Sequence, residues 1–271
     1  MTDSTVGIVI PTLGSRPDWL QMAVDSVLSQ NVKTKLVIVG ANTPHVETFA
    51  NGLGVRYIEQ DGRGLSNAIN TGWKSLRELR YFTWLGDDDI LAPGSLHNTI
   101  GVLDKQPSAK YVYGRTRYID SAGMTIYVSR PTKIAPWYMK YGQDYVPQPG
   151  SLIRTSAIGD ELLVDESLSN AMDLDLFLRL SSSGRHSWAY VAQELSAYRI
   201  HGGAITQTKG AADESEMVRS RHRSAVTSKL LPYVAPLRIQ LERVYVGVQW
   251  RLPISKKSRA AGAYCREAIK P

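Results

Sequence analysis

The first hundred residues alternate between short, continuous apolar runs and longer segments whose apolar positions recur with helical spacing. The runs cover residues 6–10, 36–39, 55–58 and 81–85, and the helical segments cover residues 17–28, 44–52 and 65–79. Continuous apolar runs of this length are typical of strands buried on both faces. Strands that alternate with helices predict right-handed crossovers and a parallel, doubly wound sheet. Ligands of such sheets bind beyond the carboxyl ends of the strands.

A different pattern begins after a further helical segment at residues 94–105. The runs 111–113, 117–119 and 125–128, with a turn at residues 120–123, predict antiparallel strands. Residues 137–149 are expected to form a loop over the ligand site at the carboxyl ends of the strands. A helix is expected to begin at Asp173, and a last strand is expected at residues 190–191. No Pro-, Ser- or Gly-rich linker divides the two patterns, so we expect one continuous α/β domain with a mixed, Rossmann-like sheet flanked by helices.

Three successive carboxylates follow the fourth apolar run. Asp87, Asp88 and Asp89 come directly after residues 81–85, and Pro93 opens the next helical segment. Like charges repel and are costly to desolvate, so adjacent acids at the end of a buried strand indicate a positively charged partner. A divalent cation such as Mg²⁺ or Mn²⁺ suits oxygen-only ligands. The pattern alone leaves a second interpretation open, a solvated loop whose acids cap the next helix.

Composition and missing motifs narrow the class of protein. The chain has 271 residues and is 43% hydrophobic, which is enough for one large domain. No apolar run approaches the roughly 18 residues of a membrane span, and residues 1–4 lack the features of a signal peptide, so a cytoplasmic protein is expected. The single cysteine, Cys265, fits a reducing compartment. Neither a Gly-x-Gly-x-x-Gly run after the first strand nor a P-loop sequence occurs.

The positive charge of the chain lies near its C-terminus. Residues 219–271 hold 12 Lys and Arg against 2 Asp and Glu, a net charge of +10, whereas the whole chain has a net charge of +7. Residues 1–218 therefore carry a net charge of −3. This distribution argues against a core that binds nucleic acid and for a basic tail that faces phosphates, an anionic bilayer or an acidic partner.

An apolar stripe runs through this basic tail at helical spacing. Its members are Leu237, Leu241, Val244, Tyr245, Val248 and Leu252. Such a stripe predicts a helix with one apolar face. Two interpretations stay open: the helix docks on the main domain, or residues 232–271 make a peripheral contact with an anionic membrane.

Four sequence blocks, in order, resemble the family 2 glycosyltransferases, which are inverting enzymes of the GT-A fold. The blocks are residues 8–12 (IVIPT), 64–72 (GLSNAINTG), 85–89 (LGDDD) and 173–179 (DLDLFLR). The resemblance covers about residues 6–205. It implies a GT-A catalytic domain at residues 1–215, which binds a nucleotide-sugar and an acceptor, and a basic helical extension at residues 216–271.

The resemblance also implies a metal site and a catalytic base. Asp88, Asp89 and His201 match the positions that hold Mn²⁺ or Mg²⁺ in the family, and Asp87 and Asp88 are expected to contact the nucleotide-sugar. Asp173 falls where the family carries its base. Inversion needs an acceptor hydroxyl to attack opposite the leaving diphosphate while one carboxylate takes its proton. A bound cation stabilises the charge that builds on the diphosphate.

Further contacts to the nucleotide-sugar are expected after the early strands. The residues are Pro11, Thr12, Asn42, Asp61, Arg63 and Asn67, although Asn67 and Asn70 have an alternative role in fixing loop geometry. The family commonly carries Asp-Asp-Gly-Ser after the second strand, where this chain has residues 40–43 (GANT). Because both acids are missing, GDP- and dTDP-sugars stay open as donors beside the favoured UDP-sugar.

The expected function is a metal-dependent, inverting glycosyl transfer to a glycan or lipid-linked acceptor, in glycan, polysaccharide or glycolipid synthesis. The expected location is cytoplasmic, with a contact to the inner face of the membrane as an extension, and no nucleic acid is expected as a partner. One alternative is a sugar nucleotidyltransferase, which normally has a Gly-rich basic loop after the first strand; here that loop has only Gly14 and Arg16. The other is a non-catalytic nucleotide-binding scaffold of the same fold.

Overall fold

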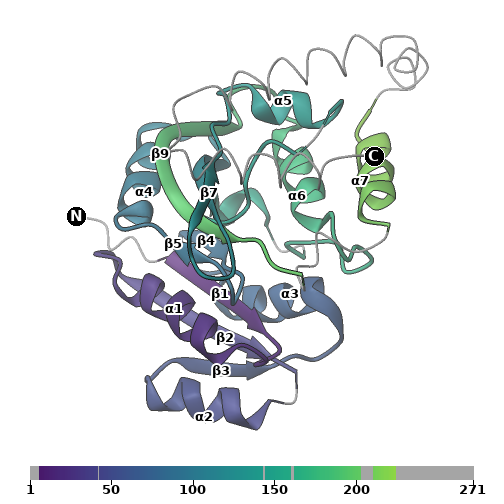
Figure 1. The fold of residues 1–271 in the computed structure, drawn as a ribbon. Coiled ribbons are helices and arrows are strands. Elements are labelled where there is room, and N and C mark those ends of the chain that lie inside the picture. The colour runs from purple at the N-terminus through teal and green to yellow at the C-terminus, as the bar shows by residue number, and fades with distance from the viewer. Residues whose placement is uncertain (1–5, 42, 143, 160–161, 203–209, 224–271) are drawn as a thin grey trace.

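The computed structural model describes residues 6–41, 43–142, 144–159, 162–202 and 210–223 (Figure 1). In the first part of the chain, strands and helices alternate. They are β1 (Val6–Thr12), α1 (Pro17–Leu28), β2 (Thr34–Gly40), α2 (Pro44–Gly52), β3 (Arg56–Glu59), α3 (Gly64–Leu76) and β4 (Tyr81–Trp84). β1 pairs with β2 and β4, and β2 pairs with β3, all in parallel. The predicted parallel half of the sheet is therefore confirmed.

The rest of the chain extends the same sheet. Its elements are β5 (Ile90–Leu91), α4 (Ser95–Lys105), β6 (Tyr111–Ile119), β7 (Thr125–Val128), α5 (Ala135–Met139), β8 (Leu152–Arg154), the short 3₁₀ helix η1 (Thr155–Ala157), α6 (Met172–Ser181), β9 (Trp188–Arg199) and α7 (Ala211–Arg221). The strand order is β3-β2-β1-β4-β8-β6-β9-β5, with β7 beside β6. β8 is antiparallel to both β4 and β6, which makes the sheet mixed, as predicted.

Two strands are longer than the sequence predicts. β6 is one strand where two were expected, and β9 extends from Trp188 to Arg199 and runs parallel to β6. Gly114 interrupts the apolar pattern of β6 because a side chain there would collide with Leu195 of β9. In β9, Glu194 interrupts the pattern because it forms an ion pair with Arg117 of β6. Both breaks arise from contacts between distant residues, and the prediction of separate short strands was wrong.

Smaller corrections concern the helices. A serine just before a helix is a common N-cap, but Ser15 does not cap α1, because the N-cap position is Arg16 and no described side chain caps the helix. Leu28, expected to face inward, is 50% exposed at the end of that helix. The region predicted as a loop, residues 137–149, includes the end of α5. The predicted helix start at Asp173 is confirmed within one residue, since α6 begins at Met172.

The core lies on both faces of the sheet. Along β1, Val6, Ile8 and Ile10 face a cluster that includes apolar residues of α1, α2 and α4. Val9 faces the opposite cluster, to which α3, α5, α6 and α7 contribute. This alternation follows from the period of two in a strand, and it explains why both sides of the sheet are covered by helices in Figure 1.

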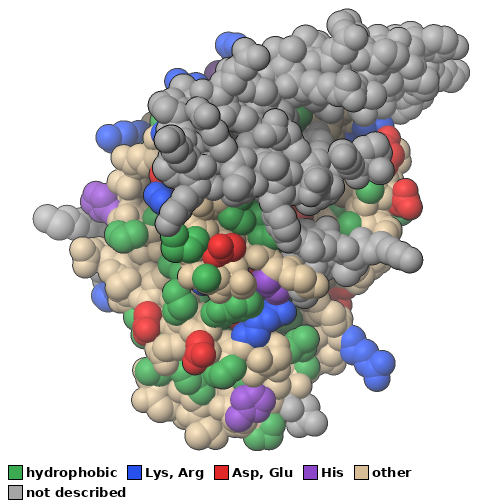
Figure 2. Space-filling model, in the orientation of Figure 1, with side chains coloured by type: hydrophobic (Ala, Val, Ile, Leu, Met, Phe, Trp, Pro, Cys, Tyr) green, Lys and Arg blue, Asp and Glu red, His purple; other side chains and the backbone are tan. Residues whose placement is uncertain are grey.

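The surface and the C-terminal part can be described only in part. Figure 2 shows hydrophobic side chains mixed with single acidic and basic ones over α1 and its surroundings.

Within the described residues, no helix has the length and apolar character needed to cross a membrane. The expected boundary between residues 215 and 216 falls inside α7. The apolar stripe at residues 237–252 and the rest of the expected contact segment, residues 232–271, lie outside the described residues.

Close packing of α3 on β1 makes Gly72 a sensitive position. A β-carbon added at Gly72 would lie 2.8 Å from Val9 Cγ1, in a strand that is fully buried. We expect Gly72→Ala to lower the free energy of unfolding by about 1–3 kcal/mol, the usual cost of overpacking. Gly101→Ala in α4 is the matched control, because no atom lies within 4 Å of its added carbon; it should stabilise the protein by roughly 0.5–1 kcal/mol. Urea unfolding of both variants measures the difference, and equal effects would contradict the packing argument.

Candidate active site

The three acids lie in a tight turn at the carboxyl end of β4, here called the acid turn and defined as residues 86–89. Leu85 N donates to Val9 O at 2.9 Å, which extends the pairing with β1, and Asp89 N donates to Gly86 O at 3.2 Å. A β-carbon added at Gly86 would lie 2.8 Å from Asp88 Oδ1 and 3.0 Å from Asp89 Oδ2. Glycine is therefore required here, because two carboxylate oxygens crowd the space that a side chain would fill.

Asp87 is tied to the end of β1. Thr12 Oγ1 donates to Asp87 Oδ2 at 2.5 Å, and the same hydroxyl accepts from Gly14 N at 2.9 Å. Arg16 Nη1 lies 3.8 Å from Asp87 Oδ1. Burial raises the pKa of Asp87, while the Thr12 hydrogen bond opposes that shift. Thr12 and Asp87, both predicted to contact the nucleotide-sugar, are thus hydrogen-bonded to each other.

Asp88, which follows β4, contacts His201, which follows β9. His201 Nε2 lies 2.7 Å from Asp88 Oδ2, and Arg16 Nη1 lies 3.6 Å from the same oxygen. The His201 side chain is 8% exposed and that of Asp88 is 20% exposed. Trp19 packs beside the imidazole, with 5.0 Å between the ring centroids. Two of the three predicted metal ligands are therefore neighbours, although 113 positions separate them in the sequence.

Asp89 faces β9. Only 4% of the residue is exposed, and its Oδ1 accepts from Arg199 N at 3.0 Å. Burial, followed by the negative charge of Asp88, raises the pKa of Asp89 well above its ordinary value. The third predicted ligand is thus held by backbone on one oxygen, while its other oxygen lies beside Gly86 together with Asp88.

Arg199 lies beside the acid turn, and the sequence did not predict this contribution to the candidate site. It is 2% exposed, its Nε donates to Asp88 O at 3.0 Å, and its guanidinium carbon lies 4.8 Å from the Trp19 ring centroid. A second nitrogen, Nη1, donates to Asp120 O at 3.2 Å, whereas Nη2 is buried and has no hydrogen-bond partner among the described residues. A signal was available in the sequence, because Arg199 and His201 are two positions apart and extended chain places such residues on one face.

The donor set is compatible with a divalent cation completed by a substrate. Within the described part of the chain, no group of three or more His, Cys, Asp or Glu side chains is arranged to hold an ion. Asp88 and His201 supply two side chains, with an oxygen of Asp89 close by. Mg²⁺ in particular commonly takes one or two carboxylates and completes its shell with water and substrate phosphates. The crowded oxygens at Gly86 and the raised pKa of Asp89 fit such an ion.

Pro11 and Thr12, two of the expected nucleotide contacts, lie beside the end of β2. Pro11 and Thr12 are buried in β1 opposite Val39 and Gly40 of β2. A β-carbon at Gly40 would collide with Thr43 Oγ1 and lie 3.0 Å from the Tyr57 hydroxyl. These two hydroxyls are 3.1 Å apart. A side chain at position 40 would collide with this pair of hydroxyls. Asn42 lies outside the described residues.

Asp61 and Asn67 are engaged by the protein itself. Asp61 accepts from Thr71 Oγ1 at 3.0 Å and from Lys74 Nζ at 3.2 Å, and these bonds lower its pKa. Asn67 Nδ2 donates to Glu166 Oε2 at 3.0 Å. The other oxygen of Glu166 accepts from Asn70, so the predicted alternative, a role in loop geometry, matches this arrangement. Arg63 is exposed directly before α3.

Asp173, the predicted base, lies on α6. It is half-buried, its Oδ1 accepts from Leu174 N at 2.8 Å, and burial raises its pKa to about 6. Desolvation by the surrounding protein, followed by the negative charge of Asp173, raises the pKa of Asp144, although part of that residue reaches solvent. Gln148 Nε2 donates to Trp84 O at 2.9 Å. Residues 144–148 therefore connect the surroundings of Asp173 to the strand that ends in the acid turn.

Asp175 on α6 has two basic partners. Arg179 Nε lies 2.8 Å from Asp175 Oδ2, and His222 Nε2 lies 3.0 Å from Asp175 Oδ1. Burial acts to raise the pKa of Asp175, but these two partners outweigh it and lower the pKa. Asp175 is thus a structural acid, in contrast to Asp173 two positions earlier.

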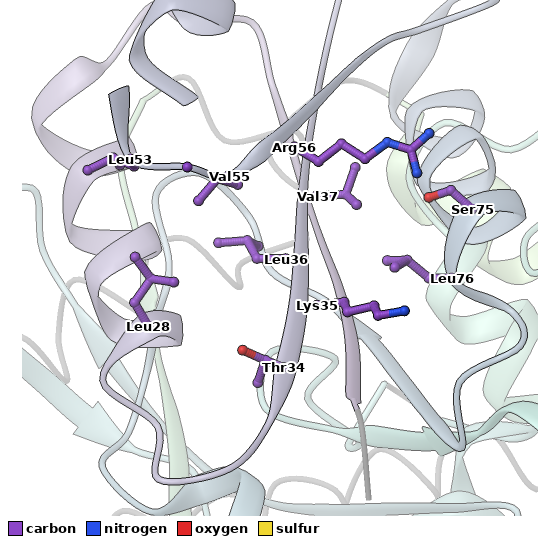
Figure 3. A pocket seen from close by; sticks show the side chains of 11 residues that line it. Leu28, Thr34, Lys35, Leu36, Val37, Leu53, Val55, Arg56, Ser75 and Leu76 are labelled. Carbon is purple, nitrogen blue, oxygen red and sulfur yellow. The ribbon is translucent and has the colours of Figure 1, made fainter. Parts of the chain in front are cut away.

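A groove of about 360 Å³ lies away from these acids (Figure 3). It is lined by apolar side chains such as Leu36 and Val55 and by the basic residues Lys35 and Arg56. Its β2 residues, 34–37, pair with the amino end of β1, whereas the acid turn contacts Thr12 at the carboxyl end. The groove is therefore not part of the site built by Asp88 and His201.

Comparison with solved structures defines the class of fold. S. aureus TarS 1–349 in complex with UDP-GlcNAc is similar, with a TM-score of 0.63 and 12% sequence identity over 98% of this chain and 82% of that chain. Glucosyl-3-phosphoglycerate synthase from Mycobacterium tuberculosis, in complex with Mn²⁺, UDP and glucosyl-3-phosphoglycerate, gives a TM-score of 0.58 at 14% identity, over 82% of each chain. These likenesses show the GT-A fold of glycosyltransferases.

The chain belongs to glycosyl transferase family 2, whose model matches residues 7–158. An uncharacterised glycosyltransferase of Rickettsia prowazekii is 29% identical over 220 residues, which cover 75% of this chain and 66% of the relative. Another, from Rickettsia bellii, is 28% identical over 65% of this chain, but the match spans 27% of the relative's length. Chondroitin synthase of Escherichia coli is 28% identical over 51% of this chain and 20% of its own length. The matched family region ends before Asp173 and His201.

Charge burial in the acid turn predicts the effect of Asp89→Asn on stability. A carboxyl whose pKa is raised on folding destabilises the folded state as pH rises above its unfolded pKa of about 4. Asparagine keeps an oxygen for Arg199 N but carries no charge. With divalent ions chelated, the variant should be more stable than the wild type at neutral pH, and the gain should shrink to nothing near about pH 3, where the carboxyl is protonated in both states. Urea unfolding at several pH values measures this, and a gain independent of pH would contradict it.

Proposed function

We propose that this protein transfers a sugar from a nucleotide diphosphate sugar to an acceptor hydroxyl, with inversion at the sugar carbon and with help from a divalent cation. The observation that carries the proposal is the contact of Asp88 with His201, 2.7 Å apart, at the carboxyl ends of β4 and β9. Ligands of open α/β sheets bind at such ends. Family membership supports the same reaction class.

The donor half of the site is the acid turn with its neighbours. Asp88 and His201 would hold Mn²⁺ or Mg²⁺, with Asp89 beside them. The chemistry that such a cation supplies is electrostatic stabilisation of the negative charge on the leaving diphosphate. Arg16, which lies 3.6 Å from Asp88 Oδ2, adds a positive charge from the start of α1. UDP is the favoured nucleotide, because similar proteins of the same fold have been crystallised with UDP or UDP-GlcNAc.

The acceptor half of the site is centred on Asp173. The attacking acceptor oxygen forms a bond to the anomeric carbon while the bond from that carbon to the diphosphate oxygen breaks. The Asp173 carboxylate takes the hydroxyl proton. A pKa raised to about 6 by burial keeps this carboxyl ionised at neutral pH while making it a stronger base than an exposed aspartate. One base is sufficient for inversion, because the acceptor attacks opposite the leaving group in a single displacement.

The acceptor is proposed to be a glycan or a lipid-linked saccharide. The E. coli relative is named for the synthesis of chondroitin, a polysaccharide. A peripheral contact with an anionic membrane through residues 232–271 would suit a lipid-linked acceptor, and their basic composition supports it.

Asp173→Asn should lower kcat by about 10²–10⁴-fold, the usual contribution of a general base, and leave donor binding unchanged. Asp175→Asn is the matched control on the same helix. Its parent carboxylate is paired with Arg179 and His222, so the control should lower the melting temperature and retain transfer below that temperature. Product formation by chromatography and donor binding by calorimetry separate the two effects.

The pH dependence follows from the same carboxylate. The base is active when ionised, so kcat/KM of the wild type should fall as pH decreases through about 6. An Asp173→Asn enzyme that retains full transfer, or a wild type without this acidic limb, would remove the assignment of the base. Release of inorganic diphosphate with formation of a nucleotide-sugar would instead identify a nucleotidyltransferase.

Ligand-dependent stability tests the donor half. UDP-, GDP- and dTDP-sugars should be compared by thermal shift with Mn²⁺ and with EDTA, because a ligand that binds only the folded state raises its stability. We expect the largest shift with a UDP-sugar and Mn²⁺. Asp88→Asn and His201→Ala should each lose most of the part that depends on Mn²⁺, whereas Asp25→Asn, an exposed acid on α1, should retain it. An equal shift in EDTA for every donor would contradict a metal site at Asp88 and His201.

A further inference from the structure

Helix α7 lies downstream of the matched family region, which ends at residue 158, and it packs against α6. It also reaches α5, because Arg219 Nε donates to Met139 O at 3.0 Å and Arg223, just beyond the helix, donates to Lys140 O. Arg221 Nη1 donates to Asp165 Oδ2 at 3.1 Å. α7 therefore connects three segments that surround the acceptor half of the site.

A carboxylate from α7 binds the backbone just before α6 begins. The first N–H groups of a helix have no partners within it, and the N-cap residue of α6, Ala171, has no side chain that can supply one. Glu214 Oε1 accepts from the backbone N–H groups of Ser169, Asn170 and Ala171, at 3.0, 2.7 and 2.8 Å. One carboxylate from a different helix thus fixes the last three residues before α6 begins.

Asp173 is the second residue of α6, so its position follows the backbone that Glu214 holds. Among the described residues, the only hydrogen-bond donor that another residue supplies to its carboxylate is Leu174 N, in the same helix. The side chain therefore moves with the helix rather than being tied to the sheet. One turn further along, His222, just after α7, contacts Asp175 at 3.0 Å. The α7 segment therefore contacts the backbone just before α6 and a side chain one turn into the helix.

We propose that Glu214 is a positioning residue for the base at Asp173, acting through the backbone of residues 169–171. This inference rests on the proposed function. Its physical basis is the sensitivity of proton transfer and displacement to geometry, since a shift of about 1 Å at a catalytic group costs on the order of 10²-fold in rate. The negative charge of Glu214 also lies at the N-terminus of α6, where it is stabilised by the helix dipole.

The test compares Glu214→Ala and Glu214→Gln with Asp213→Ala, a matched control at the exposed neighbouring acid of α7. Glutamine retains an oxygen that accepts hydrogen bonds, whereas alanine has none. Assays are run at a temperature where circular dichroism shows every variant folded. We expect Glu214→Ala to lower kcat by about 10- to 100-fold with an unchanged KM and calorimetric Kd for the donor. Glu214→Gln should recover part of the loss, and Asp213→Ala should match the wild type.

A double variant distinguishes positioning from general damage. If Glu214 acts through Asp173, then Glu214→Ala should cost little further activity once Asp173→Asn has removed the base. Full multiplication of the two losses, or a Glu214→Ala enzyme with a lower melting temperature and normal kcat, would overturn the inference. Either outcome leaves the proposed function intact as long as Asp173→Asn alone lowers kcat by the expected factor of about 10²–10⁴. An active Asp173→Asn enzyme would instead overturn the assignment of the base itself.

Discussion

Repulsion among three adjacent carboxylates is the constraint on which the rest of the site depends. Asp87, Asp88 and Asp89 occupy one tight turn, and the pKa values of the first and the last are raised mainly by burial. The turn is stabilised by partial compensation from several sides: a hydroxyl from β1, a guanidinium from α1, and a backbone N–H from β9. These partners fix the positions of the carboxylates. A divalent cation bound there would compensate the negative charge that remains on the turn.

Part of this compensation comes from the later strands of the sheet. β9 brings Arg199 and His201 to the acid turn only because it runs the length of β6 in parallel and then passes the end of β4. Arg199 is buried and supports the turn through Asp88 O, while His201 contacts the carboxylate of the same residue. A site that begins in the matched family region is therefore completed by residues that lie after it.

The sequence predicted the parallel half of the fold because residues buried on both faces leave a continuous apolar run. It missed the extent of β6 and β9, because Gly114 and Glu194 break the local pattern for reasons that lie in the opposite strand. The same limit applies to the site. Asp88 and His201 were predicted as neighbours, whereas the engagement of Asn67 by Glu166 depends on a contact between residues 99 positions apart. Local patterns report burial and spacing, and they do not report which polar partner a distant segment supplies.

Environment separates the roles of the acids more clearly than residue type does. Asp87 and Asp89 have raised pKa values, and His201 lies beside Asp88, so a bound cation would lower the two raised values and keep those carboxylates ionised. Burial raises the pKa of Asp173 to about 6, so this carboxylate is able to accept a proton near neutral pH. Asp175, two positions away, is held ionised by Arg179 and His222 and is unsuited to that role. Divergent pKa values among neighbouring carboxyls are the usual means by which one site assigns charge stabilisation and proton transfer to different residues. In this chain the α7 segment contributes to the different environments of the two acids. Glu214 binds the backbone just before Asp173, and His222 contacts the carboxylate of Asp175.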